Sequence, residues 1–252
     1  MNKRTAAVWV CFFLPLFFFA YCLLSPSSGA CQIREALGPS LFDPLFGTLT
    51  GLLLIAAFFA TESPRLRASK EISVVSMIIA LGSAGRILFV ALPNVSPVDW
   101  LTLCSGIVFG PTTGFTVGAG IMMVSNFWLG QGPWTISQMV GMGMLGLVGG
   151  VVGRVPGLRR RHALAAIGFI WGPVYGTVTT FFWMLYVSSV SWVSFAGLWA
   201  SGLPFYLLQG VGNSVLLWLL GERTVAIFQR VRLRLLAGFG EARSGVSPVE
   251  SG

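Results

Sequence analysis

The chain has 252 residues, of which 55% are hydrophobic and 10% are charged, and its formal net charge is +8. A soluble domain carries about 25% charged residues, and a water-soluble fold of this length cannot hide so much apolar surface in one core. The composition therefore excludes an ordinary soluble protein. The long, unbroken apolar runs predict helices that cross a membrane, rather than the alternating strands of a barrel.

Eight apolar segments are predicted to be membrane helices, separated by turn residues or charges. The first two, residues 6–24 and 47–60, form an N-terminal helix pair with an outer loop; the first could instead be a signal peptide, because a basic stretch precedes it. The six that follow are residues 72–92, 98–109, 115–129, 136–152, 163–186 and 199–220. The predicted organisation is a helix pair (1–71), a six-helix substrate-binding membrane domain (72–236) and a disordered cytoplasmic tail (237–252).

Lysine and arginine residues predict the orientation of the chain. If the N-terminus is cytoplasmic and the chain crosses eight times, nearly all basic residues of the loops fall on the cytoplasmic side. Arg34 falls outside, and Arg86 lies within a helix. We therefore expect a multi-pass protein of the plasma membrane with a cytoplasmic C-terminus.

Arg86 is the charged residue that a membrane helix tolerates least, since burial costs about 2.5–3.5 kcal/mol on insertion scales. It is expected to face a cavity or a partner, of which Asp99 is the nearest acidic candidate, or to snorkel to the outer surface. On the same helix, Ala80 and Ala84 form an edge of small residues that suits close contact with another helix. Arg86 points about 140° away from this edge, which predicts a helix with one docking face and one pocket face. The alternative is that the edge packs within the chain.

Polar and aromatic residues gather toward the outer ends of the predicted helices. Tyr206, Gln209 and Asn213 form a polar stripe along the last helix, and Gln138 lies one turn from Trp134. Tryptophan at this depth also forms interfacial belts, and membrane amides also bond to neighbouring helices. The candidate substrate-binding residues are Arg86, Asn94, Asp99, Asn126, Gln131, Trp134, Gln138, Trp183, Tyr206, Gln209 and Asn213.

Catalytic and nucleotide-hydrolysing motifs are missing from the sequence, which contains no HExxH, GxSxG or Walker A pattern. The single histidine, His162, lies in a basic loop, and the four cysteines lack metal-binding spacing. The sequence therefore predicts a non-enzymatic protein without a cofactor or metal. Glycines at intervals of four, such as Gly106, Gly110 and Gly114, predict tight helix packing.

An ordered set of motifs between Ala80 and Gly153 resembles the substrate-binding S component of energy-coupling factor (ECF) vitamin transporters. The resemblance covers residues 72–236, whose six helices are the number this family uses, whereas the N-terminal helix pair departs from the family pattern. The motifs are Ala80-x-x-x-Ala84, Gly85-Arg86, Leu92-Pro93-Asn94-Val95-x-Pro97, Gly110-Pro111-x-x-Gly114-Phe115-x-x-Gly118, Ser125-Asn126 and Gly130-Gln131-Gly132-Pro133-Trp134-Thr135.

The resemblance implies a subunit that binds a vitamin or related micronutrient near the outer face. Such a subunit docks on a transmembrane T component that carries two cytoplasmic ATPases, and the docking role would fall on Ala80 and Ala84. The Leu-Pro-Asn-Val and Gly-Gln-Gly-Pro-Trp signatures are most similar to those of members assigned to cobalamin or its precursors. Two alternatives remain: a self-sufficient secondary transporter, which the absence of intramembrane carboxylates disfavours, and a membrane-embedded enzyme that acts on lipids.

Overall fold

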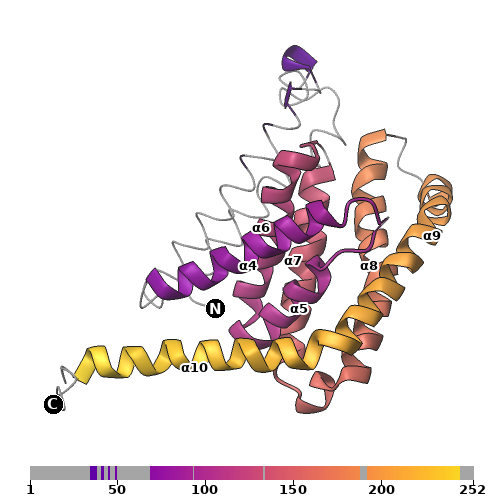
Figure 1. Ribbon diagram of the computed structural model, residues 1–252. Coiled ribbons are helices and arrows are strands. Elements are labelled where there is room, and N and C mark those ends of the chain that lie inside the picture. The colour runs from indigo at the N-terminus through magenta and orange to yellow at the C-terminus, as the bar shows by residue number, and fades with distance from the viewer. Residues whose placement is uncertain are drawn as a thin grey trace.

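The computed structural model describes residues 35–38, 41–42, 45, 49, 69–92, 94–132, 134–187 and 192–244, and every regular element among them is helical (Figure 1). Three helical stretches are long and apolar enough to cross a membrane: Trp134–Val152, Arg161–Trp183 and Trp192–Leu235. The predicted all-helical class and membrane character are thereby confirmed. The predicted N-terminal helices, residues 6–24 and 47–60, fall almost entirely outside the described residues.

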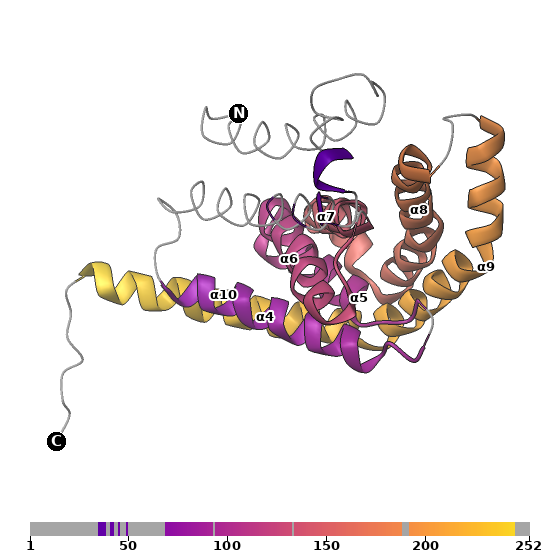
Figure 2. The same ribbon diagram turned by 90° about the horizontal axis from the view of Figure 1, so that it is seen from above.

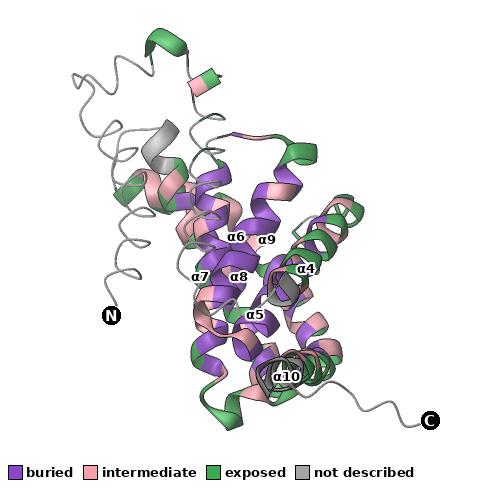
Figure 3. Cartoon of the chain, turned by 90° about the vertical axis from the view of Figure 1, so that its left-hand side faces the viewer, coloured by how far each residue is buried: buried purple, intermediate pink, exposed green. Residues whose placement is uncertain are grey.

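Three helices form the buried centre: α5 (Val98–Phe109), α6 (Pro111–Leu129) and α7 (Trp134–Val152) (Figure 3). They cross at glycines, and a β-carbon on Gly106, Gly114 or Gly146 would clash with the backbone of a neighbouring helix. The glycine spacing therefore serves close backbone approach, as predicted. Gly110 and Gly130, at φ 101° and 103°, end α5 and α6 in a conformation that glycine alone adopts without strain.

Helix α4 (Ser69–Leu88) packs mainly against α6 and less extensively against α5. Gly82 contacts Ile121, and the hydroxyl of Ser83 donates a hydrogen bond to the Ile121 carbonyl at 3.3 Å. The small-residue edge at Ala80 and Ala84 is exposed. In the described part of the chain, this edge is therefore not used for packing within the molecule.

Helices α8 (Arg161–Val187) and α9 (Trp192–Leu216) form a pair beside the central helices (Figure 2). Gly172 of α8 lies against the backbone of α9 near Gly210, which lets the two helices approach closely. A short 3₁₀ turn, η1 (Pro156–Arg159), connects α7 to α8. The cavity described below lies between this pair and the C-terminal end of α4.

The chain bends sharply after α9, at the π-helical turn η2 (Leu217–Gly221), and continues as α10 (Glu222–Ser244) across the end of the bundle (Figure 1). Contacts with α5 fix this course, among them a hydrogen bond and an aromatic pair. The indole of Trp100 donates a hydrogen bond to the Thr224 hydroxyl at 3.0 Å, and the rings of Phe109 and Phe228 are 5.7 Å apart.

Several helix boundaries differ from those expected from the sequence: α4 ends at Leu88 instead of residue 92, and α6 begins at Pro111 instead of residue 115. Two differences are larger. Helix α9 begins at Trp192 instead of Trp199, because the segment between them keeps enough apolar residues to continue a helix. Helix α10 extends to Ser244, into the tail predicted to be disordered from residue 237. Its run of arginine and leucine favours helix strongly, which the high polarity of this stretch concealed.

Candidate functional site

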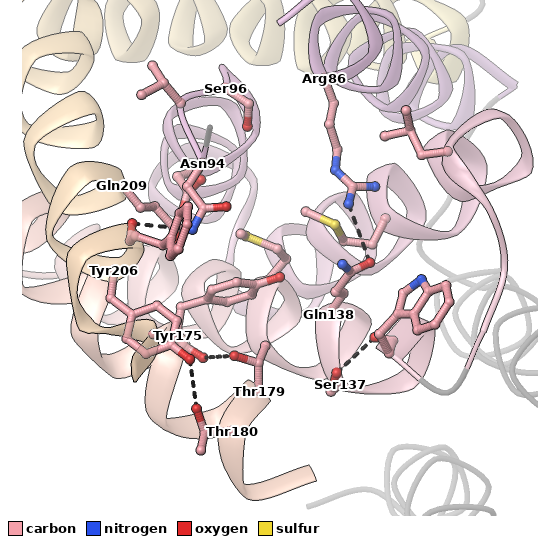
Figure 4. A pocket seen from close by; sticks show the side chains of 18 of the residues that line it. Arg86, Asn94, Ser96, Ser137, Gln138, Tyr175, Thr179, Thr180, Tyr206 and Gln209 are labelled. Carbon is pink, nitrogen blue, oxygen red and sulfur yellow. Dashed lines mark hydrogen bonds between the residues drawn. The ribbon is translucent and has the colours of Figure 1, made fainter. Parts of the chain in front are cut away.

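A cavity of about 700 Å³ lies between the C-terminal end of α4, the first turns of α5 and α7, and the facing sides of α8 and α9 (Figure 4). The loop from α4 to α5 forms part of its wall. Asn94 holds this loop against α9 by donating a hydrogen bond from its side-chain amide to the Phe205 carbonyl at 3.2 Å. The backbone of Asn94 is left-handed (φ 54°), a conformation that asparagine tolerates better than most residues.

Arg86 reaches the cavity from the last turn of α4 and is held by side chains of α6 and α7. Its Nη1 donates to Ser125 Oγ and to Asn126 Oδ1, both at 2.6 Å, and its Nη2 lies 3.4 Å from Gln138 Oε1. Arg86 is therefore turned toward the bundle interior and does not snorkel to the surface. Its hydrogen-bond partners among the described residues are all neutral, so they orient the guanidinium without cancelling its charge.

The acceptors around Arg86 are themselves fixed. The Ser125 hydroxyl donates to the Ile121 carbonyl at 2.7 Å, which leaves its oxygen to accept from the guanidinium. The Asn126 amide nitrogen donates to Gln138 Oε1 at 2.9 Å and to Thr135 Oγ1 at 3.2 Å, so its carbonyl oxygen must face Arg86. The arrangement uses three of the five N–H donors of the arginine and leaves the others for a ligand.

Asp99 forms a second polar group, on the α9 side of the cavity. It lies in the first turn of α5, where a carboxylate interacts favourably with the helix dipole, and it is 2% exposed. Gln209 Nε2 donates a hydrogen bond to Asp99 Oδ1 at 3.1 Å, and the amide of Asn213 lies near the same carboxyl group. Gln209 Oε1 and both polar atoms of Asn213 are buried without a hydrogen-bond partner. This region thus retains unused hydrogen-bonding capacity next to the cavity.

Helix α8 adds hydroxyl groups and aromatic rings between these two polar groups. The hydroxyls of Thr180 and Tyr206 are 2.7 Å apart, which ties α8 to α9, and Tyr175 projects between the two polar groups (Figure 4). Two tryptophans also line the cavity, Trp183 on α8 and Trp134 on α7. A ligand in the cavity would meet aromatic surface as well as charge.

Most of the candidate residues line this one cavity, and three do not. The lining residues are Arg86, Asn94, Asp99, Trp134, Gln138, Trp183, Tyr206 and Gln209. Asn126 lies behind the wall and orients Arg86. Gln131 donates to the Met123 carbonyl at 3.3 Å and accepts from Thr135, so it braces the turn between α6 and α7. Asn213 lies below the cavity, beneath Gln209.

Most of the contribution of α8 was not predicted from the sequence. Tyr175 and Thr179, spaced four apart, form a polar stripe on a helix in which only Trp183 was singled out. The same spacing criterion that identified Gln209 and Asn213 would have found them. Also missed were smaller and apolar lining residues, including Ser96, Met122, Ser137, Met142, Thr180 and Ser201.

The cavity can bind, orient and shield a small molecule. His162 starts α8 and lies about 20 Å along the helix from Tyr175, at 1.5 Å per residue, so it cannot act in the cavity. Within the described ranges, no group of three or more histidine, cysteine, aspartate or glutamate residues could hold a metal ion. Comparisons with protein-family models, with curated proteins and with solved structures find no match to this chain.

Proposed function

We propose that this protein is the membrane-embedded, substrate-specific binding subunit of an ECF-type transporter that takes up a vitamin or related micronutrient, with cobalamin or a precursor as the first substrate to test. The observation that carries the proposal is the cavity with Arg86 at its wall. A volume of about 700 Å³ falls within the roughly 300–1,000 Å³ typical of small-molecule sites.

Arg86 supports a ligand that carries a carboxylate or phosphate group. The neutral partners of Arg86 leave its positive charge uncompensated and some of its N–H donors unused. An anion with two oxygens would balance the charge and accept hydrogen bonds from those donors. The aromatic side chains of Tyr175, Tyr206 and Trp183 add apolar area, as expected for a vitamin-sized molecule.

The exposed edge at Ala80 and Ala84 supports docking on a T component. Small side chains let a second helix approach closely, and this edge faces away from α6 and from the cavity. Binding and docking would then use separate faces of α4. In this proposal α4 to α9 would form the six-helix domain, and α10 would follow it.

The distribution of charge supports an outward-facing cavity. Trp134, at the start of α7, lines the cavity, whereas Arg154, Arg160 and Arg161 follow the opposite end of this helix. Basic residues mark the cytoplasmic side of a plasma-membrane protein. The cavity would therefore open outward, and the C-terminus would lie in the cytoplasm.

Co-purification tests the proposal. The full chain, tagged and expressed in its own host, should bring down a T component and two ATPase subunits, and the complex should take up substrate only with ATP. Ala80→Trp should abolish complex formation because the bulky indole separates the two helices, while substrate binding is retained. Ala166→Trp, on an exposed position of α8, is the matched control and should have no effect. A fully active chain without any partner would refute the proposal.

Asp99 favours one rival function, a secondary transporter driven by an ion gradient. An absence of intramembrane carboxylates was expected to disfavour this function, but that expectation is wrong, because Asp99 is buried within the bundle beside the cavity. Proteoliposomes that contain only this protein distinguish the two functions. Substrate accumulation driven by a proton or sodium gradient alone would favour the rival; accumulation only with the T component, ATPases and ATP supports the ECF-type subunit.

A further inference from the structure

Helix α10 does not fit the role of a membrane-spanning helix. The continuous helical stretch Trp192–Leu235 has 44 residues, which corresponds to about 66 Å at 1.5 Å per residue. The hydrocarbon core of a bilayer is only about 30 Å thick. The bend at η2 resolves this mismatch, because α10 leaves the direction of α9 and lies across the end of the bundle (Figure 1).

The sides of α10 differ in chemistry. Thr224, Val225 and Phe228 turn toward the bundle and are buried or partly buried against it. Arg223, Arg230 and Arg234 are exposed, and at 100° per residue they fall within about 40° of one another on a single stripe. The side that packs on the bundle also includes Arg232, which donates a hydrogen bond to the Val108 carbonyl at 2.7 Å, and the exposed arginine stripe faces away from it. An arginine stripe flanked by exposed apolar side chains is typical of a helix that lies in the plane of a membrane interface.

The neighbouring chain segments strengthen the positive charge at this end. Arg161, at the start of α8, bonds to Glu222 through both its backbone amide (2.8 Å) and its side chain (3.5 Å). Glu222 is thereby paired with Arg161, and from Arg223 to Arg234 the helix carries no acidic residue. Leu233 and Ile227, 65% and 55% exposed, flank the stripe and can contact lipid.

We infer that α10 is an interfacial helix whose Arg223–Arg230–Arg234 stripe binds the headgroups of anionic phospholipids in the adjacent leaflet. Anionic headgroups complement the stripe in charge, and guanidinium groups bind phosphate through paired N–H donors. A membrane is the occupant that the geometry favours over a soluble acidic partner, because the bundle that carries α10 is itself membrane-embedded. The inference does not depend on the transport role proposed above.

The test is lipid binding to the purified full-length chain in neutral detergent, followed by native mass spectrometry. Dioleoyl phosphatidylglycerol and dioleoyl phosphatidylcholine serve as probes, since they share acyl chains and differ in headgroup charge. The wild-type protein should bind phosphatidylglycerol more tightly, by roughly 10- to 100-fold, and the preference should shrink as salt rises. The triple variant Arg223→Gln/Arg230→Gln/Arg234→Gln should lose most of that preference.

The control variant Arg65→Gln/Arg67→Gln/Lys70→Gln removes the same charge from another segment and should keep the preference. The single variant Arg230→Gln, with a smaller loss, replaces the triple variant if that one fails to fold. The inference is overturned if the wild type binds the two lipids equally, or if the control variant loses the lipid preference as much as the triple variant does. A soluble acidic partner would then be the occupant of the stripe to test.

Discussion

Arg86 is a charge that the fold orients but does not neutralise among the described residues, so a bound anion should compensate it. We predict that Arg86→Ala weakens binding of the identified substrate by roughly 10- to 150-fold, equivalent to about 1.5–3 kcal/mol, the scale of a hydrogen bond to a charged group. Arg86→Lys should recover only part of the affinity, because an ammonium cannot form the paired bonds of a guanidinium. Substrate titration on purified protein measures the effect.

The exposed Arg160, at the other end of α7, supplies the control for this experiment, since Arg160→Ala should bind substrate as the wild type does. Unchanged affinity in Arg86→Ala would contradict a role for this arginine in binding. The cavity would then have to recognise its ligand through other side chains.

Gln209 also contributes to stability, because its side-chain amide donates a hydrogen bond to the buried Asp99 carboxyl group. Gln209→Leu, which keeps a similar volume, should lower stability by about 1–3 kcal/mol, since it leaves the carboxyl group less satisfied. Gln229→Leu, at an exposed position on α10, should change stability by less than about 0.5 kcal/mol. Thermal unfolding of both variants in detergent checks this, and similar shifts for the two would show that the Asp99 bond contributes little.

At the scale of elements, the contact between α5, α6 and α7 depends on glycine. A β-carbon at position 146 would meet the backbone at Gly114, which has no side chain that could move away. Gly146→Ala should therefore destabilise the protein by about 1–3 kcal/mol, as overpacking does. Gly197→Ala, on α9 with no atom near the added carbon, should be neutral or stabilising because alanine favours helix. The melting temperatures of the two variants test this prediction. Equal melting temperatures would mean that the helices can move apart at position 146 without loss of stability.

At the scale of the whole molecule, the cavity and the basic loop lie at opposite ends of α7, which predicts opposite sides of the membrane. Single cysteines at Ser96→Cys and Arg160→Cys test this in a chain whose other cysteines are serine, apart from the buried Cys104. A membrane-impermeant maleimide applied to intact cells should label position 96 and should reach position 160 only after permeabilisation. Labelling of position 160 in intact cells would reverse the proposed orientation.

The sequence by itself determined the features that depend on residues close together in the chain. The low charge and long apolar runs specify helices in a membrane, and the breaks at Gly110 and Gly130 place the ends of α5 and α6. Periodicity also separated the faces of α4, with Ala80 and Ala84 exposed on one side and Arg86 bonded to α6 on the other. Helical spacing fixes these relations before any tertiary contact forms.

Only the tertiary structure decided which polar side chains meet. Gln209 and Asp99 are separated by 110 residues, and their bond depends on how α9 crosses α5. For the same reason Tyr175 joins the cavity from α8, whereas Gln131, close to Trp134 in sequence, braces a turn instead. The bend at η2 that lays α10 across the bundle is likewise set by its contacts with α5. Such crossings follow from packing of all the helices together, because local periodicity fixes the faces of a helix but not the neighbours they contact.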